Sequence, residues 1–391
     1  MGSCPASAGR PRFDIADIVR QHRAELEAEQ WLSVTERRVL TAIERCRTAA
    51  LGGHVEVCRS CGHEQPAYNS CRNRHCPKCQ CLAQERWIAA RAERLLPVGH
   101  FHVVFTVPSE LRSLCRLAPR VLFEALFRSA SDTLLELGQS HLGGSLGVTM
   151  VLHTWTRDLR FHPHVHAIVT AGGVDASGGW HPTKEFLFHV EVMGQLLRGK
   201  MLEQLRRLQR NGAALGRPAE SEDPEAFDRL MARLAKTRWV VYAKRPFRRI
   251  EHVLGYLGRY THRVAISNSR LVNVSASAVV FRTKEGKLHS IAPVAFLRRF
   301  IQHVLPDGFK KIRHYGLYAS GADDKLVVAR ARLASVGTSA PEVRAPAPSW
   351  QQLLRELTGR DADRCPRCGA AIERRAIDRQ TARGPPAPEA A

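Results

Sequence analysis

Long apolar runs are absent from this sequence of 391 residues. A transmembrane helix needs about 18 or more consecutive apolar residues, so the sequence predicts no membrane span. The N-terminal segment, Met1 to Arg12, also lacks the apolar core of a secretory signal. We therefore expect a cytoplasmic protein that has no membrane partner.

Acidic residues are scarce relative to basic ones. The 37 Asp and Glu residues stand against 59 Lys and Arg, which gives a formal net charge of +22. This excess is larger than solubility requires and favours a polyanionic partner, with nucleic acid ahead of an anionic membrane surface. The hydrophobic content of 44% is that of an ordinary folded chain, long enough for two or three domains.

The chain contains eleven cysteines, which in a reducing cytoplasm indicate metal ligands rather than disulfides. Cys58 and Cys61 form one CxxC pair, and Cys76 and Cys79 form a second pair further along the chain. Two such pairs predict four thiolates around one tetrahedral, structural Zn²⁺.

Other cysteines and histidines leave further metal sites open. A second zinc site is an alternative, with ligands drawn from Cys46, His54, Cys71 and His75. Near the C-terminus, Cys365 and Cys368 form a lone CxxC that looks like half of a zinc ribbon. The pattern leaves open whether this pair binds metal or is incidental.

The patterning divides the chain into four parts and is compatible with an α+β fold. These parts are an N-terminal helical segment at 1–45, a small zinc-binding module at 46–96, a larger mixed domain at 97–335 and a partly disordered tail at 336–391. In the larger domain we expect strands at 101–107, 147–156, 164–170 and 239–243, helices at 110–138, 190–236 and 251–261, and a hairpin at 271–292.

Three histidines, His162, His164 and His166, occupy alternate positions in one predicted strand. Successive side chains of a strand point to opposite faces, so all three project to the same side. Such a row of imidazoles indicates a nitrogen site for a divalent metal. The simpler interpretation is that one or two of them are hydrogen-bonded core histidines.

Two of the six tyrosines, Tyr256 and Tyr260, are one helical turn apart and share one face of a predicted helix. A tyrosine can attack a phosphodiester and form a covalent phosphotyrosine, provided that arginines or a metal neutralise the phosphate. The alternative is that the two rings only pack one helix face. The candidate DNA-binding residues around them are Arg248, Arg249, Arg259 and Arg263.

Together these motifs resemble the HUH endonuclease superfamily, which is defined by a histidine–hydrophobic–histidine motif. The closest resemblance is to the two-tyrosine rolling-circle transposases of the insertion sequence 91 family. It extends from about residue 14 to residue 335 and includes the cysteine-rich module, the histidine strand, the tyrosine pair and the segment Ile312–Gly316.

This resemblance implies an HUH-type central antiparallel sheet flanked by helices, with a helical and zinc-ribbon-like module before it and a catalytic domain at 97–335. It implies a DNA transposase of a bacterial cytoplasm, associated with the nucleoid, that nicks and rejoins the single-stranded ends of a mobile element. His164 and His166 would hold Mg²⁺ or Mn²⁺, and His162, or a polar residue from elsewhere, would complete the site. One tyrosine would form a 5′-phosphotyrosine, and the second would act on the other strand or element end.

Three other functions compete with this one. An HUH replication initiator would use the same chemistry. A metal-dependent hydrolase of small molecules would leave the basic charge and the tyrosine pair without a role. A non-enzymatic zinc-ribbon DNA-binding regulator would leave the histidine strand without one. The order in which the tyrosines act, the target sequence and the oligomeric state do not follow from the sequence.

Overall fold

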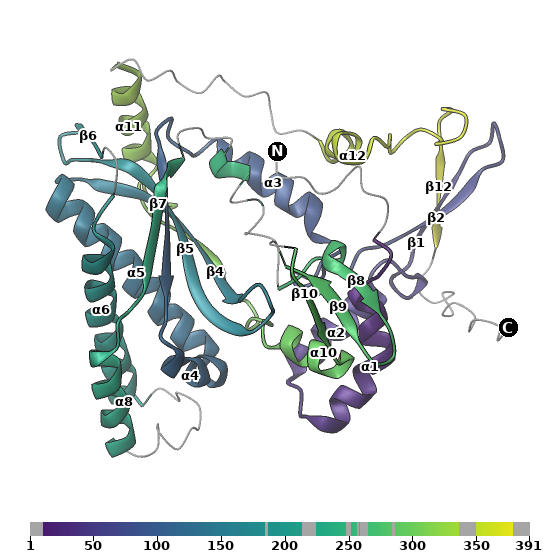
Figure 1. The fold of residues 1–391 in the computed structure, drawn as a ribbon. Helices are drawn as coiled ribbons and strands as arrows, with labels where there is room; N and C mark the ends of the chain where they lie inside the picture. The colour runs from purple at the N-terminus through teal and green to yellow at the C-terminus, as the bar shows by residue number, and fades with distance from the viewer. Residues whose placement is uncertain are drawn as a thin grey trace.

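The computed structural model describes residues 11–183, 187–212, 224–247, 252–255, 258, 265–283, 286–335 and 349–377 (Figure 1). Within these ranges, no helix combines the length and apolar character that crossing a membrane requires.

A six-stranded antiparallel sheet forms the centre of the molecule. Its strand order is β11 (Ile312–Gly316), β4 (Ser145–Trp155), β5 (Phe161–Val174), β3 (His100–Thr106) and β7 (Val241–Phe247), and the short β6 (Trp180–Pro182) pairs with the end of β5. Each pairing is antiparallel. The predicted α+β class with a central antiparallel sheet is therefore confirmed.

One face of this sheet packs against helices and makes the largest hydrophobic core. Val165, Ala167 and Val169 of β5 point into it, together with side chains of α5 (Pro119–Leu142) and α6 (Val190–Arg210). Helix α5 begins at a proline, where a missing N–H costs nothing, and ends before the left-handed Gly143. The helices α4 (Arg112–Leu117) and α8 (Pro224–Lys236) lie at the same side of the sheet (Figure 1).

The opposite face of the sheet carries the histidines and a smaller core. Val151 of β4 and Ile168 of β5 pack there with Val253 and Leu254, which belong to the helical residues 252–255. The same cluster takes side chains from α3 (Gln80–Ala92) and α11 (Asp323–Ser335).

A second lobe joins the N-terminal helices to a later part of the chain. Helices α1 (Ile15–Glu29) and α2 (Val34–Arg45) share one core with α10 (Pro293–Ile301) and the sheet of β8 (Leu271–Val274), β9 (Val279–Arg282) and β10 (Leu288–Ile291). The packing thus joins residues that the sequence places in two different parts, 1–45 and 97–335.

A third sheet joins the two ends of the chain. Strand β1 (Gly53–Val57) lies between β2 (Glu64–Tyr68) and β12 (Glu373–Ile377), both antiparallel to it. Helix α12 (Trp350–Thr358) precedes β12, and Figure 1 shows this C-terminal segment beside the β1–β2 hairpin. The remaining elements are the 3₁₀ helices η1 (Ala49–Leu51), η2 (Ser109–Leu111) and η3 (Asn268–Arg270).

A buried hydrogen-bond chain joins the start of β3 to Tyr318, which follows β11. The Tyr318 hydroxyl accepts a hydrogen bond from the Leu96 N–H at 3.1 Å and lies 2.8 Å from Nε2 of His100. His100 Nδ1 donates to the Val98 carbonyl at 2.9 Å. Burial lowers the pKa of His100 to about 4, so the ring is neutral at pH 7 and its Nε2 accepts the Tyr318 proton.

Replacing Tyr318 with phenylalanine should lower the free energy of unfolding by about 1–3 kcal/mol, because it leaves the Leu96 N–H and His100 Nε2 buried without their partner. Urea unfolding measures the difference. The control is Tyr242→Phe, since Tyr242 is 53% exposed on β7. An unchanged unfolding midpoint in Tyr318→Phe would show that this chain contributes nothing.

Candidate functional site

Three histidines meet on the face of the central sheet that is opposite α5 and α6. His153 of β4 joins His164 and His166 of β5, and one ring nitrogen from each lies within 4.8 Å of the others. His153 is directly opposite His164 in the strand register. The ring centroids of His153 and His166 are 4.3 Å apart. Three imidazoles at this spacing are a suitable donor set for one divalent ion.

His162 lies outside this group, although it points to the same face. Residues i and i+4 of a strand are roughly 13 Å apart, whereas paired residues on adjacent strands are about 5 Å apart. One ion with bonds of about 2.1 Å can therefore reach two alternate histidines and a cross-strand neighbour, but not three along one strand. His162 Nδ1 instead accepts a hydrogen bond from Arg112 at 3.0 Å. The structure therefore does not group His162 with His164 and His166, and it brings His153 to them from the neighbouring strand.

Hydrogen bonding selects the tautomer of His164. Its Nδ1 lies 2.7 Å from the His162 carbonyl, which can only accept, so the proton is on Nδ1 and the lone pair is on Nε2. Burial lowers the pKa of His164 to about 4. The ring is therefore neutral at pH 7, as a metal ligand must be.

His102 of β3 forms a hydrogen bond with His166. Its Nε2 lies 2.8 Å from His166 Nδ1, and the ring is only 4% exposed. His166 can bind a metal through Nε2 when its Nδ1 donates to His102, the arrangement in which an outer residue orients a ligand. Burial, and then the charge of Lys244, lowers the pKa of His102 to about 4, so it remains a neutral acceptor. The roles of His102 and His153 were not predicted from the sequence, because both residues lie in predicted strands that carry no local metal motif.

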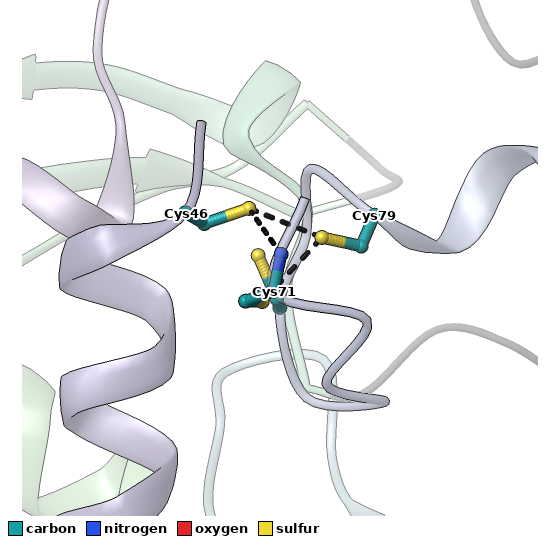
Figure 2. A group of neighbouring side chains, drawn as sticks. Cys46, Cys71 and Cys79 are labelled. Atoms are coloured by element: carbon teal, nitrogen blue, oxygen red, sulfur yellow. Dashed lines mark hydrogen bonds between the residues drawn. The ribbon is translucent and has the colours of Figure 1, made fainter. Parts of the chain in front are cut away.

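A group of four cysteines lies between α2 and α3: Cys46, Cys71, Cys76 and Cys79. Figure 2 shows the Cys46, Cys71 and Cys79 side chains converging. Cys79 Sγ is 3.1 Å from Cys46 Sγ and 3.4 Å from Cys71 Sγ. Four thiolates around zinc would be about 3.8 Å apart, so a modest expansion accommodates the ion. Hydrogen bonds from the Cys46 and Cys71 thiols hold the pKa of Cys79 well below its usual value.

Cys58 and Cys61 do not join Cys76 and Cys79, so the four-cysteine site predicted from the two CxxC pairs is wrong. The first pair lies at the tip of the β1–β2 hairpin, and the other cysteines lie at its base. A strand of five residues separates tip from base by roughly 16 Å. Cys58 and Cys61 are instead grouped with Cys365 and Cys368.

The alternative zinc set is brought together only in part. Cys46 and Cys71 lie in the same cysteine group, whereas His54 and His75 do not belong to it. His54 lies on β1, with its Nε2 3.8 Å from the Glu56 carboxylate. His75 Nε2 accepts a hydrogen bond from the Leu305 N–H at 3.1 Å. Burial, with help from Arg74 and Lys311, lowers the pKa of His75 to about 3.

The predicted tyrosine site lies outside the described residues, as do its arginines: Tyr256, Tyr260, Arg248, Arg249, Arg259 and Arg263. Described neighbours of the tyrosines nevertheless have defined positions. Val253 and Leu254 pack with Val151, which is directly opposite His166 in the register. At Gly258, an added Cβ would lie 2.3 Å from Ile88 of α3, so the backbone there touches that helix. These neighbours therefore pack on the histidine face.

Comparisons with known families and proteins agree with this architecture. A family model described as "Transposase zinc-binding domain" matches residues 18–107, and one described as "Putative transposase" matches residues 147–325. The first range contains all four cysteines of the Cys46 group, and the second contains His153, His164 and His166.

Two similar proteins extend over nearly the whole chain. "Putative transposase y4qJ" of Sinorhizobium fredii is 41% identical over 369 residues, which covers 91% of this chain and 92% of that protein. "Transposase for insertion sequence element IS801" of Pseudomonas savastanoi pv. phaseolicola is 29% identical over 381 residues, covering 94% of this chain and 90% of that protein. No solved structure matches significantly.

Substitution can distinguish whether His153 or His162 is the third metal ligand. His153→Ala should weaken Mn²⁺ binding by more than the 10- to 100-fold that loss of an outer-shell residue typically causes, because it removes a direct donor. His162→Ala should leave the affinity unchanged. Titration calorimetry on protein with its cysteine sites zinc-loaded measures both. The reverse ranking of the two variants would contradict the assignment of His153.

Because His102 orients His166 and does not bind the metal itself, we expect its replacement to reduce the Mn²⁺ affinity less than His153→Ala does. His102→Phe keeps a flat ring but loses the acceptor for His166, and should weaken Mn²⁺ binding roughly 10- to 100-fold. The matched control is His141→Phe, because His141 is exposed on α5. Equal affinities in the two variants would remove His102 from the site.

Proposed function

The chain belongs to the insertion sequence 91 family of transposases, and from this premise we propose that it nicks and rejoins single-stranded DNA through a tyrosine nucleophile. The observation that carries the proposal is the packing of residues 252–255 on the same sheet face as His153, His164 and His166. A nucleophile on this segment and a metal on the histidines would act on one phosphate.

Tyr256 and Tyr260 are the proposed nucleophiles. The phenol oxygen of one attacks the scissile phosphorus, the bond from phosphorus to the 3′ oxygen breaks, and the phenol proton is transferred so that the leaving strand ends in a 3′-hydroxyl. The other strand end stays attached as a 5′-phosphotyrosine. Attack by a 3′-hydroxyl reverses the step and restores a phosphodiester, so rejoining needs no external energy source.

His153, His164 and His166 would hold the divalent metal. The three nitrogens fit an ion in number and spacing, and His164 is neutral with its lone pair on Nε2. When bound, the metal would polarise the scissile phosphate and stabilise its developing charge. Nitrogen donors favour Mn²⁺ over Mg²⁺, so we propose Mn²⁺ as the better cofactor.

The basic residues around the tyrosines would hold the DNA backbone. Transposition acts on DNA, and a net charge of +22 supports binding to a polyanion. We assign phosphate contacts to Arg248, Arg249, Arg259 and Arg263. Two tyrosines, rather than one, would allow a second cleavage while the first strand remains attached, as a rolling-circle transfer between two element ends requires.

A cleavage assay tests the proposal. Single-stranded DNA that carries the flanking ends of the encoding element is incubated with the protein and Mn²⁺ or Mg²⁺, with the label at the 3′ end in one set and at the 5′ end in another. We expect a metal-dependent nick in which the 3′-labelled fragment becomes attached to protein and the 5′-labelled fragment is released. Tyr256→Phe/Tyr260→Phe should lose both products, because no phenol oxygen remains to attack.

The control for this variant is Tyr242→Phe, which changes an exposed tyrosine of β7 and should cleave as wild type does. Cleavage without a covalent adduct in the double variant would indicate water as the nucleophile, as in a hydrolase. DNA binding without any cleavage by the zinc-loaded wild type would favour the DNA-binding regulator instead.

A further inference from the structure

We propose that Cys58, Cys61, Cys365 and Cys368 bind a second zinc ion, which fastens the C-terminal segment to the N-terminal zinc-binding module. The two pairs are more than 300 residues apart in the chain, and Cys365 and Cys368 lie outside both matched ranges. Two of the four ligands, Cys58 and Cys61, thus lie within the matched zinc-binding range, and the other two come from beyond both matched ranges. The proposed cleavage chemistry uses none of the four.

The four sulfur atoms have the spacing of a tetrahedral site. Cys58 Sγ is 3.5 Å from Cys368 Sγ, and Cys61 Sγ is 3.7 Å from Cys365 Sγ. All four lie within 4.8 Å of one another. Zinc–sulfur bonds of about 2.3 Å put neighbouring sulfurs about 3.8 Å apart, close to these distances. Disulfides would need sulfurs about 2.05 Å apart and would join them only in pairs.

The two cysteine pairs have the same backbone geometry, although they come from opposite ends of the chain. Each is a CxxCG turn in which the glycine N–H donates to the carbonyl of the first cysteine, Gly62 to Cys58 at 2.9 Å and Gly369 to Cys365 at 3.0 Å. Both glycines are left-handed, with φ of 68° and 76°. Such paired turns, each supplying two thiolates from one loop, form the two halves of a zinc ribbon.

The amide of the first cysteine is also used identically in the two turns. The Cys58 N–H donates to the His63 carbonyl at 2.9 Å, and the Cys365 N–H donates to the Ala370 carbonyl at 2.8 Å. Backbone hydrogen bonds therefore close both loops in the same way and place the two thiols of each pair on one side of its turn. This repetition makes a chance approach of two unrelated cysteine pairs a poor explanation.

Strand pairing aligns the two halves. Strand β12 follows the second turn and pairs with β1 in an uninterrupted register from Val57–Glu373 to Gly53–Ile377. Arg360 adds an ion pair with Glu56, whose side chain is largely buried. Pairing along a single strand of five residues holds β12 to β1 only weakly. A zinc ion bound by cysteines of both segments would strengthen this attachment.

The second zinc would also position the segment that precedes it. Helix α12 contacts α3, and α3 is the helix whose Ile88 meets Gly258 between the two candidate tyrosines. The C-terminal segment at 349–377 would thus be held against the same helix that supports the tyrosine segment.

Zinc content tests the inference without any DNA. Elemental analysis uses full-length protein that carries His153→Ala, so that the histidine group does not add a zinc ion of its own. It should find two zinc ions per chain when all the cysteines are unchanged. On this background, Cys365→Ser/Cys368→Ser and, separately, Cys58→Ser/Cys61→Ser should each hold one, because either change removes half of the ligands. Cys115→Ala is the matched control and should keep two, since Cys115 is buried at α4 and belongs to neither group.

A second measurement follows the attachment of the segment. Limited proteolysis should cut residues 349–377 from Cys365→Ser/Cys368→Ser faster than from wild type, while the remaining chain stays intact. One zinc when all the cysteines are unchanged, two zinc ions in either double cysteine variant, or Cys58–Cys368 and Cys61–Cys365 disulfides in protein purified under reducing conditions would overturn the inference. Because no step uses DNA, failure of the cleavage mechanism would leave this result unaffected.

Discussion

The antiparallel register between β4 and β5 is the constraint on which the candidate metal site depends. It puts His153 opposite His164 and Val151 opposite His166, so that imidazoles from two strands meet on one face. Since side chains alternate along a strand, a slip of one residue would turn His153 into the helical core on the opposite side. The deep burial of Val165 and Ala167 on that opposite side therefore helps to hold the histidines in place.

The central sheet separates a structural face from a functional face. The face covered by α5 and α6 is apolar, whereas the other combines the histidine group with the smaller core that includes Val253 and Leu254. The proposed chemistry needs a nucleophile and a phosphate-binding metal within a few ångströms of each other. Strands supply the histidines on a rigid base, and Val253 and Leu254, which precede Tyr256 in the chain, pack on the same face.

The length of the β1–β2 hairpin, rather than the spacing of the cysteines in the sequence, decides which cysteines lie together. The β1–β2 hairpin separates Cys58 and Cys61 from Cys46 and Cys71, and this leaves one pair at the tip to meet a pair from the other end of the chain. The N-terminal module is consequently attached to later parts of the chain at two points. Its helices α1 and α2 share a core with α10, and its hairpin takes β12 as a third strand. Both contacts restrict how the module can lie relative to the rest of the chain.

The sequence by itself determined the main strands of the sheet, the cysteine-rich module and the histidine strand, because periodicity and motif spacing are local properties. The transposase family, and with it the α+β class with a central antiparallel sheet, came from the resemblance of these motifs to a known family. The sequence also placed His164 and His166 on one face. Only the tertiary structure decided that His153 rather than His162 lies with them, that His102 forms a hydrogen bond with His166, and that Cys58 and Cys61 meet Cys365 and Cys368. The roles of Tyr256 and Tyr260 remain predictions. The physical reason is that alternation along a strand determines which side a residue faces, whereas its neighbours across strands depend on pairings between segments distant in the chain, which no local pattern encodes.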